Sequence, residues 1–189
     1  MSAAAAILAE NTVFSRAFGV STMITAAKNK RSLMGTVLGV MWFTLWAGAA
    51  ARLLSVYVSE TDKLLMPLCY AAAVGCIYAV TLVLARLFTG RAFGHIKKYV
   101  HISAFNSAVM GTIFLSAGRC SSLNEYLMFG IFAGLGFAIA AVMLSGVYRQ
   151  LCSENVPGAF RGFPAIMIYT GLMAMAVYGI SGRTPGYRG

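Results

Sequence analysis

The stretch Tyr99–Gly118, YVHISAFNSAVMGTIFLSAG, decides the fold class of this chain. It contains no Asp, Glu, Lys or Arg, yet Ser103, Asn106 and Ser107 lie near its centre. A helix rises about 1.5 Å per residue, so an uncharged stretch of about twenty residues can cross a hydrocarbon core of about 30 Å. Polar and small residues at the centre of such a span indicate unwound backbone or half-helices. We therefore predict a membrane-spanning segment that is broken near its middle.

Other apolar stretches of similar length lie on both sides of this one. Hydrophobic residues make up 59% of the chain and charged residues only 11%, which is far from the balance of a soluble domain. Helices satisfy all their backbone polar groups internally, as lipid requires. The sequence predicts one all-α integral membrane domain over residues 1–189, with six transmembrane helices. The predicted spans are 3–27, 32–58, 64–88, 99–118, 126–148 and 162–182.

The first predicted span differs from the others because Glu10 and Arg16 interrupt it. No basic n-region precedes it and no polar mature domain follows it, so we expect a spanning segment rather than a cleaved signal peptide. Towards its end it reaches Gly19, Ser21 and Thr22. This run of small and polar residues predicts a second broken helix.

Spans one and four hold corresponding places in a 3+3 arrangement of six helices. The two halves are inverted relative to each other, because three spans reverse the direction of the chain. In inverted-repeat folds, discontinuous helices meet near the midplane and form the site through which something passes. The alternative is that the serine and threonine hydroxyls merely bond back to carbonyls of their own helices.

The orientation follows from the basic residues that flank the predicted spans. Nine lie on the side that includes the connection between spans one and two, and five lie on the other side. The excess predicts that this connection is cytoplasmic and that both termini lie on the outer face. The net charge of +10 therefore needs no nucleic-acid partner, because topology and anionic lipid headgroups account for it. The nine are Lys28, Lys30, Arg31, Arg86, Arg91, Lys97, Lys98, Arg149 and Arg161.

Small residues within the spans predict close helix packing. Gly35 and Gly39, and Gly130 and Gly134, form small-xxx-small pairs, and Ala47–Ala51 forms a smooth patch. Such patterns allow two helix backbones to approach closely in a membrane.

The usual motifs of soluble enzymes are absent from the sequence. There is no HExxH, no CxxC and no GxxxxGK[ST].

Cys69 and Cys76 share a helix face and are expected to be buried small hydrophobes. His101 is expected to be a hydrogen-bonded core histidine. Arg16 is harder to explain in this way, because an unpaired guanidinium in a membrane usually faces a cavity, a partner or an interface. We predict an ion path that includes Arg16, Thr22 and Ser103, with Arg16 as a charge gate.

Several motifs together resemble those of one known family. The sequence is similar to the RnfA/NqrE family, the six-helix membrane subunits of Rnf and sodium-pumping NADH:quinone oxidoreductase complexes. The resemblance covers nearly the whole chain and is weakest from Trp42 to Arg91. It rests on Asn155–Gly162 (NVPGAFRG), Thr170–Met173 (TGLM), Gly179–Gly182 (GISG), Phe129–Gly130, Gly134–Phe137 (GLGF), Asn11, Val13, Phe18–Gly19 and Lys28.

The resemblance implies a cofactor that the residues of this chain do not suit. The family holds a two-iron two-sulfur cluster with two cysteines of its own and two more from a homologous sister subunit of the RnfE/NqrD type. Ser21 and Ser107 stand at the two cysteine positions. A thiolate is a soft ligand for iron, whereas a serine hydroxyl is a hard group that loses its proton at far higher pH. We therefore expect the cluster to be absent or only weakly held by this chain.

The predicted midplane site consists of Ser21, Asn106 and Ser107, with Gly19 and Gly111 allowing close backbone approach. The resemblance implies a subunit, inactive as an enzyme alone, of an ion-translocating electron-transport complex in a bacterial-type cytoplasmic membrane. Flavin, nicotinamide and ferredoxin chemistry would belong to partner subunits, and the ion would be sodium or a proton. The alternative is a stand-alone small membrane transporter or scaffold that has kept the fold and lost redox coupling.

Overall fold

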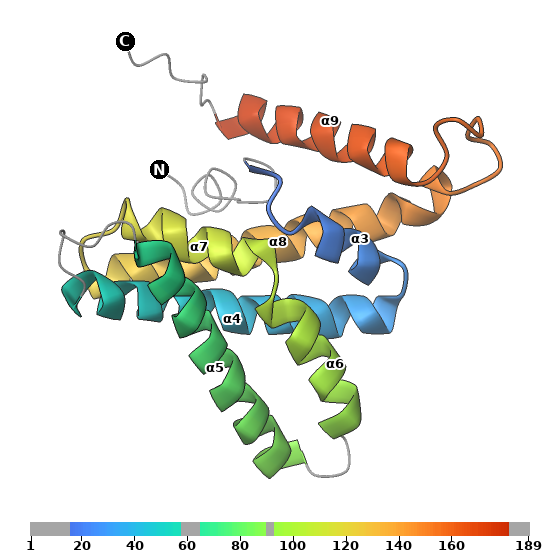
Figure 1. The fold of residues 1–189 in the computed structure, drawn as a ribbon. Coiled ribbons are helices and arrows are strands. Elements are labelled where there is room, and N and C mark those ends of the chain that lie inside the picture. The colour runs from blue at the N-terminus through green and yellow to red at the C-terminus, as the bar shows by residue number, and fades with distance from the viewer. Residues whose placement is uncertain (1–15, 58–64, 90–92, 182–189) are drawn as a thin grey trace.

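A computed structural model describes residues 16–57, 65–89 and 93–181 (Figure 1). Within these ranges the chain forms seven helices and no strand, so the predicted all-α class is confirmed. The helices are α3 (Val20–Ala27), α4 (Lys30–Tyr57), α5 (Met66–Thr89), α6 (Phe93–Ala104), α7 (Ser107–Ala117), α8 (Leu123–Leu151) and α9 (Phe163–Ser181).

Three of these helices are long and apolar enough to cross a membrane: Ser32–Val56 in α4, Met66–Phe88 in α5 and Leu123–Leu151 in α8. The α6–α7 pair qualifies as a fourth span if it is counted as one bent element, and Phe163–Gly179 of α9 is a shorter apolar helix. The protein is thus a multi-pass membrane protein. The count of six spans stays a prediction, because most of the first predicted span lies outside the described residues.

The helix pair α4 and α8 forms the centre of the fold, and the two helices run side by side (Figure 1). These are the middle helices of the two predicted halves. The half-helix α7 packs more extensively on α4 than on α8, and the half-helix α3 packs more extensively on α8 than on α4. Each half-helix therefore rests on the central helix of the other half. A 3+3 inverted repeat predicts this exchange.

The contact between α4 and α8 depends on glycines, as the small-xxx-small pattern predicts. A Cβ atom on Gly130 would stand 2.5 Å from the carbonyl oxygen of Thr44, and one on Gly48 would stand 2.5 Å from the carbonyl oxygen of Tyr126. Ala47 and Ala51 beside them are fully buried. The two backbones therefore touch directly, which maximises van der Waals contact where lipid provides no hydrophobic drive.

Replacing Gly130 with alanine is expected to destabilise the folded chain by about 1–3 kcal/mol, the usual range for overpacking. The added Cβ would meet backbone atoms of α4, which cannot rotate away. Gly146→Ala on the same helix is the matched control, because a Cβ there has no neighbour within 4 Å. Thermal unfolding in detergent should show a lowered midpoint for the first variant only. Equal midpoints would contradict direct backbone contact.

Two side-chain expectations have different outcomes. His101 is hydrogen-bonded, since its Nδ1 lies 2.5 Å from the hydroxyl of Tyr78, so that part of the prediction is confirmed; the residue is half-buried rather than in the core. The prediction of two buried cysteines on α5 is wrong for Cys76, which is exposed, whereas Cys69 is half-buried. The reason is that α5 splays away from the central pair with α6, so much of its surface faces outward (Figure 1).

Candidate functional site

The first break in the predicted helices lies just before α3. Ala17 and Gly19 both have left-handed backbone, with φ of 57° and 81°, and α3 begins at Val20. Its first intrahelical bond runs from the Met23 N–H to the Gly19 carbonyl, at 2.9 Å. Glycine populates positive φ without a Cβ penalty, so Gly19 fits the position that the turn requires.

The second break separates α6 from α7, whose axes differ in direction by 45°. Asn106 is extended here, with φ of −91° and ψ of 134°, and it is the N-cap of α7. Its side-chain Oδ1 accepts a hydrogen bond from the Ala108 N–H at 3.1 Å. Asparagine is among the best N-cap residues, because its short side chain satisfies an amide that the helix leaves free. The predicted break in span four is confirmed.

The two breaks meet in space although 88 residues separate them. The Gly19 N–H donates a hydrogen bond to Ser107 Oγ at 2.8 Å. A Cβ atom on Gly19 would lie 3.0 Å from Asn106 Oδ1 and 3.0 Å from the ring of Phe137. We call this contact between Phe18–Gly19 and Asn106–Gly111 the helix-break junction.

A second contact of the helix-break junction joins Phe18 to Gly111. A Cβ on Gly111 would overlap the ring of Phe18, so the ring fills the space that glycine leaves on α7. Gly111 is buried and Phe18 is half-buried. Close approach of a bulky ring to the helix backbone is therefore the reason for glycine at position 111.

The predicted site residues differ in their access to the surroundings. Ser21 and Ser107 are exposed, whereas Asn106 is 1% exposed. Ser21 lies in a groove of about 460 Å³ between α3 and α9, which Ala17 and Thr170 also line. The structure therefore joins Gly19, Asn106, Ser107 and Gly111 in the junction and places Ser21 at its border on the surface.

The predicted ion-path residues have separate environments. Arg16 is exposed and Thr22 is half-buried on α3. Ser103 is fully buried and donates a hydrogen bond to the Thr36 carbonyl of α4 at 3.2 Å. No hydrogen bond of the described residues joins these three side chains, and the ion path stays a prediction.

The hydroxyls of the broken spans make two kinds of hydrogen bond, and whether the breaks form a path stays a prediction. Thr112 bonds back to the Ala108 carbonyl at 2.8 Å and Thr25 bonds back to the Ser21 carbonyl at 3.0 Å, which is ordinary behaviour within a helix. Ser103 and Ser107 instead make hydrogen bonds to other elements. These two serine hydroxyls link the predicted halves of the fold.

Comparison with known proteins decides the family. The model of the Rnf-Nqr family, described as "Rnf-Nqr subunit, membrane protein", matches residues 2–183 of the chain. The chain belongs to the Rnf-Nqr family. The match includes every residue that the structure describes.

Curated relatives of this Rnf-Nqr protein align over almost their full lengths. A subunit of the Na(+)-translocating ferredoxin:NAD(+) oxidoreductase complex of Acetobacterium woodii is 24% identical, with 96% of this chain and 95% of the relative covered. A subunit of the ion-translocating oxidoreductase complex of Cereibacter sphaeroides is 26% identical, with 94% and 93% covered. Its counterpart in Pasteurella multocida is 22% identical, with 93% and 92% covered.

The donor set of this Rnf-Nqr protein does not suit the iron–sulfur cluster that the resemblance implies. Both cysteine positions hold alcohols, and Ser107 Oγ already accepts the Gly19 N–H. Among residues 16–57, 65–89 and 93–181, no group of three or more His, Cys, Asp or Glu side chains can hold a metal. The four cysteines are free thiols on α5 and on the connections that follow α7 and α8.

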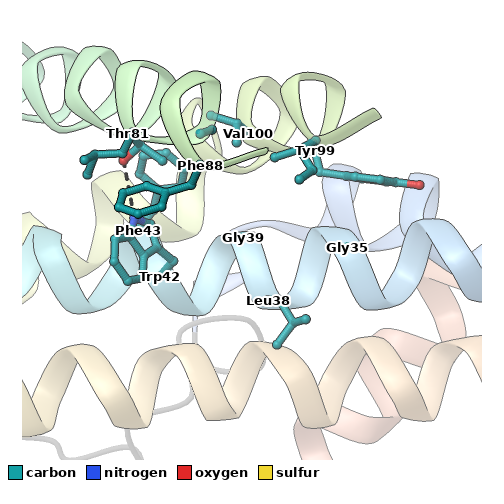
Figure 2. A pocket seen from close by; sticks show the side chains of 12 residues that line it. Gly35, Leu38, Gly39, Trp42, Phe43, Thr81, Phe88, Tyr99 and Val100 are labelled. Carbon is teal, nitrogen blue, oxygen red and sulfur yellow. Dashed lines mark hydrogen bonds between the residues drawn. The ribbon is translucent and has the colours of Figure 1, made fainter. Parts of the chain in front are cut away.

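One feature of the Rnf-Nqr chain was not predicted from its sequence. Figure 2 shows a groove of about 490 Å³ between α4, α5 and α6, lined by Gly39, Trp42 and Tyr99 among others. The Trp42 Nε1–H donates to Thr81 Oγ1 at 3.3 Å inside it. Its lining is almost wholly apolar, and Tyr99 is the one titratable residue in it.

Proposed function

We propose that this chain is a membrane subunit of a multi-subunit, ion-translocating electron-transport complex of the Rnf/Nqr type. The observation that carries the proposal is the family match over residues 2–183, and the helix-break junction lies within the matched residues. The names of the relatives support it, because each is a subunit of an oxidoreductase complex that translocates ions. The chain would lie in a bacterial-type cytoplasmic membrane with both termini on the outer face.

The side chains of this chain indicate which roles in that complex it has and which belong to other subunits. A homologous sister subunit of the RnfE/NqrD type would cover the surface that exposes Ser21 and Ser107. This chain would supply the pseudo-twofold membrane core and would hold no cluster, or only one bound chiefly by its partner. Electrons would pass through other subunits, and this subunit would contribute to the path of Na⁺ or H⁺. Arg16 would act as the charge gate of that path.

Purification of the tagged chain in mild detergent tests this assignment. Recovery of a sister membrane subunit together with flavin and iron–sulfur subunits is the expected result. Recovery of a lone homodimer would instead support the stand-alone transporter or scaffold, which the fold alone also permits.

Iron analysis of the purified complex tests the role of the two serines. Because an alcohol is a poor ligand for iron, Ser21→Ala and Ser107→Ala are expected to leave the iron content per complex unchanged. The double variant Ser21→Cys with Ser107→Cys restores the soft donors and is expected to raise the content towards two additional irons, the number in the family's cluster. Stoichiometric iron that disappears in either alanine variant would show that the serines are ligands after all.

A further inference from the structure

The groove between α4, α5 and α6, which we call the apolar groove, continues along α4 into a second hollow. The first part reaches from Gly35 to Phe43 and has a volume of about 490 Å³. The second part has about 330 Å³, shares Trp42 and Thr81 with the first, and extends to Trp46. At about 1.5 Å per residue, the apolar groove is about 16 Å long on α4. Half of a hydrocarbon core of about 30 Å is nearly the same length, so the groove extends through about one leaflet.

The cross-section of the apolar groove suits a flexible chain and not a helix. Gly35 and Phe43 are about 12 Å apart along α4, so the volume of about 490 Å³ corresponds to a mean cross-section of about 40 Å². A helix with its side chains is about 10 Å or more across, and a circle of that width has an area of about 80 Å². The occupant is therefore narrower than a helix of a partner subunit, and an apolar lining requires it to be apolar too.

Contacts between helices show which of their ends meet at one end of the apolar groove. Gly35 lies against the ring of Tyr99 and Gly39 lies against Ser103, so α6 runs in the same direction as α4. The start of α6 and the end of α5, which only residues 90–92 separate, therefore lie at the end of the groove where α4 begins. Figure 2 shows the Tyr99 hydroxyl on the side away from Trp42, toward this end.

This end of the apolar groove is basic. Three exposed cations each stand next to a lining residue in the sequence: Lys97 and Lys98 on α6, and Arg86 on α5. Helices α4, α5 and α6 contain no Asp or Glu. No ion pair among the residues that the structure describes involves these three side chains. Lys and Arg can lay their apolar stems along a groove and hold their charges at its mouth, so the mouth attracts an anionic group.

We propose that the apolar groove binds one anionic phospholipid, with one acyl chain along α4 and the phosphate at Lys97, Lys98 and Arg86. The inference goes beyond the proposed function, because it requires only that the chain lies in a membrane. A zwitterionic phospholipid has the same acyl chains, but its headgroup adds a cation that the three basic side chains repel. A free phosphate would meet the charges and leave the groove unfilled.

Photo-crosslinking of the complete assembly in phosphatidylcholine vesicles tests the proposal. Phosphatidylglycerol and phosphatidylcholine probes carry the same diazirine-bearing acyl chain, and mass spectrometry locates the labelled residues. We expect the phosphatidylglycerol probe to label the lining residues of α4 and α5 at least about tenfold more than the phosphatidylcholine probe. Excess glycerol 3-phosphate should not reduce this labelling, because it lacks an acyl chain. Equal labelling by the two probes, or competition by glycerol 3-phosphate, would overturn the proposal.

Removal of charge tests the site of the phosphate. Lys97→Gln combined with Lys98→Gln is expected to weaken binding of the phosphatidylglycerol probe about 30-fold and to leave labelling by the phosphatidylcholine probe unchanged. Arg149→Gln is the control, because Arg149 is an exposed cation in the last turn of α8, and no residue of α8 lines the apolar groove. Undiminished phosphatidylglycerol labelling in the double variant would contradict the proposal.

Filling the apolar groove tests the site of the acyl chain. Ala85→Trp places a large ring in the lining and is expected to abolish labelling of the α4 residues by the phosphatidylglycerol probe. Val83→Trp is the matched control, since Val83 is exposed on the same helix and lines neither part of the groove. Equal labelling in these two variants, with unfolding midpoints like that of the unaltered protein, would also overturn the proposal. The subunits recovered report on the proposed function separately, so either idea can fail without the other.

Discussion

Gly19→Ala is expected to destabilise the folded chain by about 2–5 kcal/mol. The φ of 81° places this residue in the left-handed region, where a side chain costs about 1–2 kcal/mol. The new Cβ would also lie 3.0 Å from both Asn106 Oδ1 and the Phe137 ring, and such overpacking costs about 1–3 kcal/mol more. Thermal unfolding of the purified protein in detergent measures the change.

A matched control separates the two causes. Gly162 has nearly the same backbone, with φ of 82°, but a Cβ on it would meet no atom within 4 Å. Gly162→Ala should therefore show the backbone strain alone, about 1–2 kcal/mol. If the two variants unfold at the same midpoint, the helix-break junction is not the close contact described here.

Gly111→Val is expected to have an effect of similar size, because the side chain would occupy the space of the Phe18 ring. Phe18 would have to leave the helix-break junction, which would open the contact between the two halves. We expect a loss of about 3 kcal/mol or more, or failure to recover the chain in its assembly, since the clash involves more than one methyl group. Detergent-resistant assembly and the unfolding midpoint are the measurements.

A double variant tests whether Phe18 is the cause. Phe18→Ala alone removes packing and should also destabilise the protein. Combined with Gly111→Val, however, it vacates the space that valine needs, so the double variant should be more stable than Gly111→Val alone. This non-additivity is the signature of two residues in direct contact. Strictly additive losses would place the effect of Gly111→Val elsewhere.

Sequence reasoning predicted the breaks well because their causes are local. A central Asn106 followed by Ser107 favours an N-cap, and Gly19 favours a left-handed turn, so both can be recognised within a few residues. The roles of the hydroxyls could not be predicted in the same way. Ser103 packs against α4 because Gly39 leaves room for it, and its place in an ion path stays a prediction. That contact depends on how two helices cross.

The same limit applies to the partners across the helix-break junction. No pattern in the sequence pairs Gly19 with Ser107, because the pairing is a tertiary contact between the two halves. The fit of Phe18 on Gly111 was likewise not predicted, although glycine at 111 was expected to allow close approach. Exposure of Cys76 was missed because an apolar span gives no sign of which face meets neighbouring helices and which meets lipid.

The hydrogen bond from Gly19 to Ser107 has a consequence for biogenesis. A junction tied by iron can close only after a cluster has been delivered to the membrane, whereas one tied by a hydroxyl can close as soon as both segments have been inserted. Under the proposal that this chain holds no cluster, its own insertion and folding should therefore proceed at the normal rate in cells starved of iron.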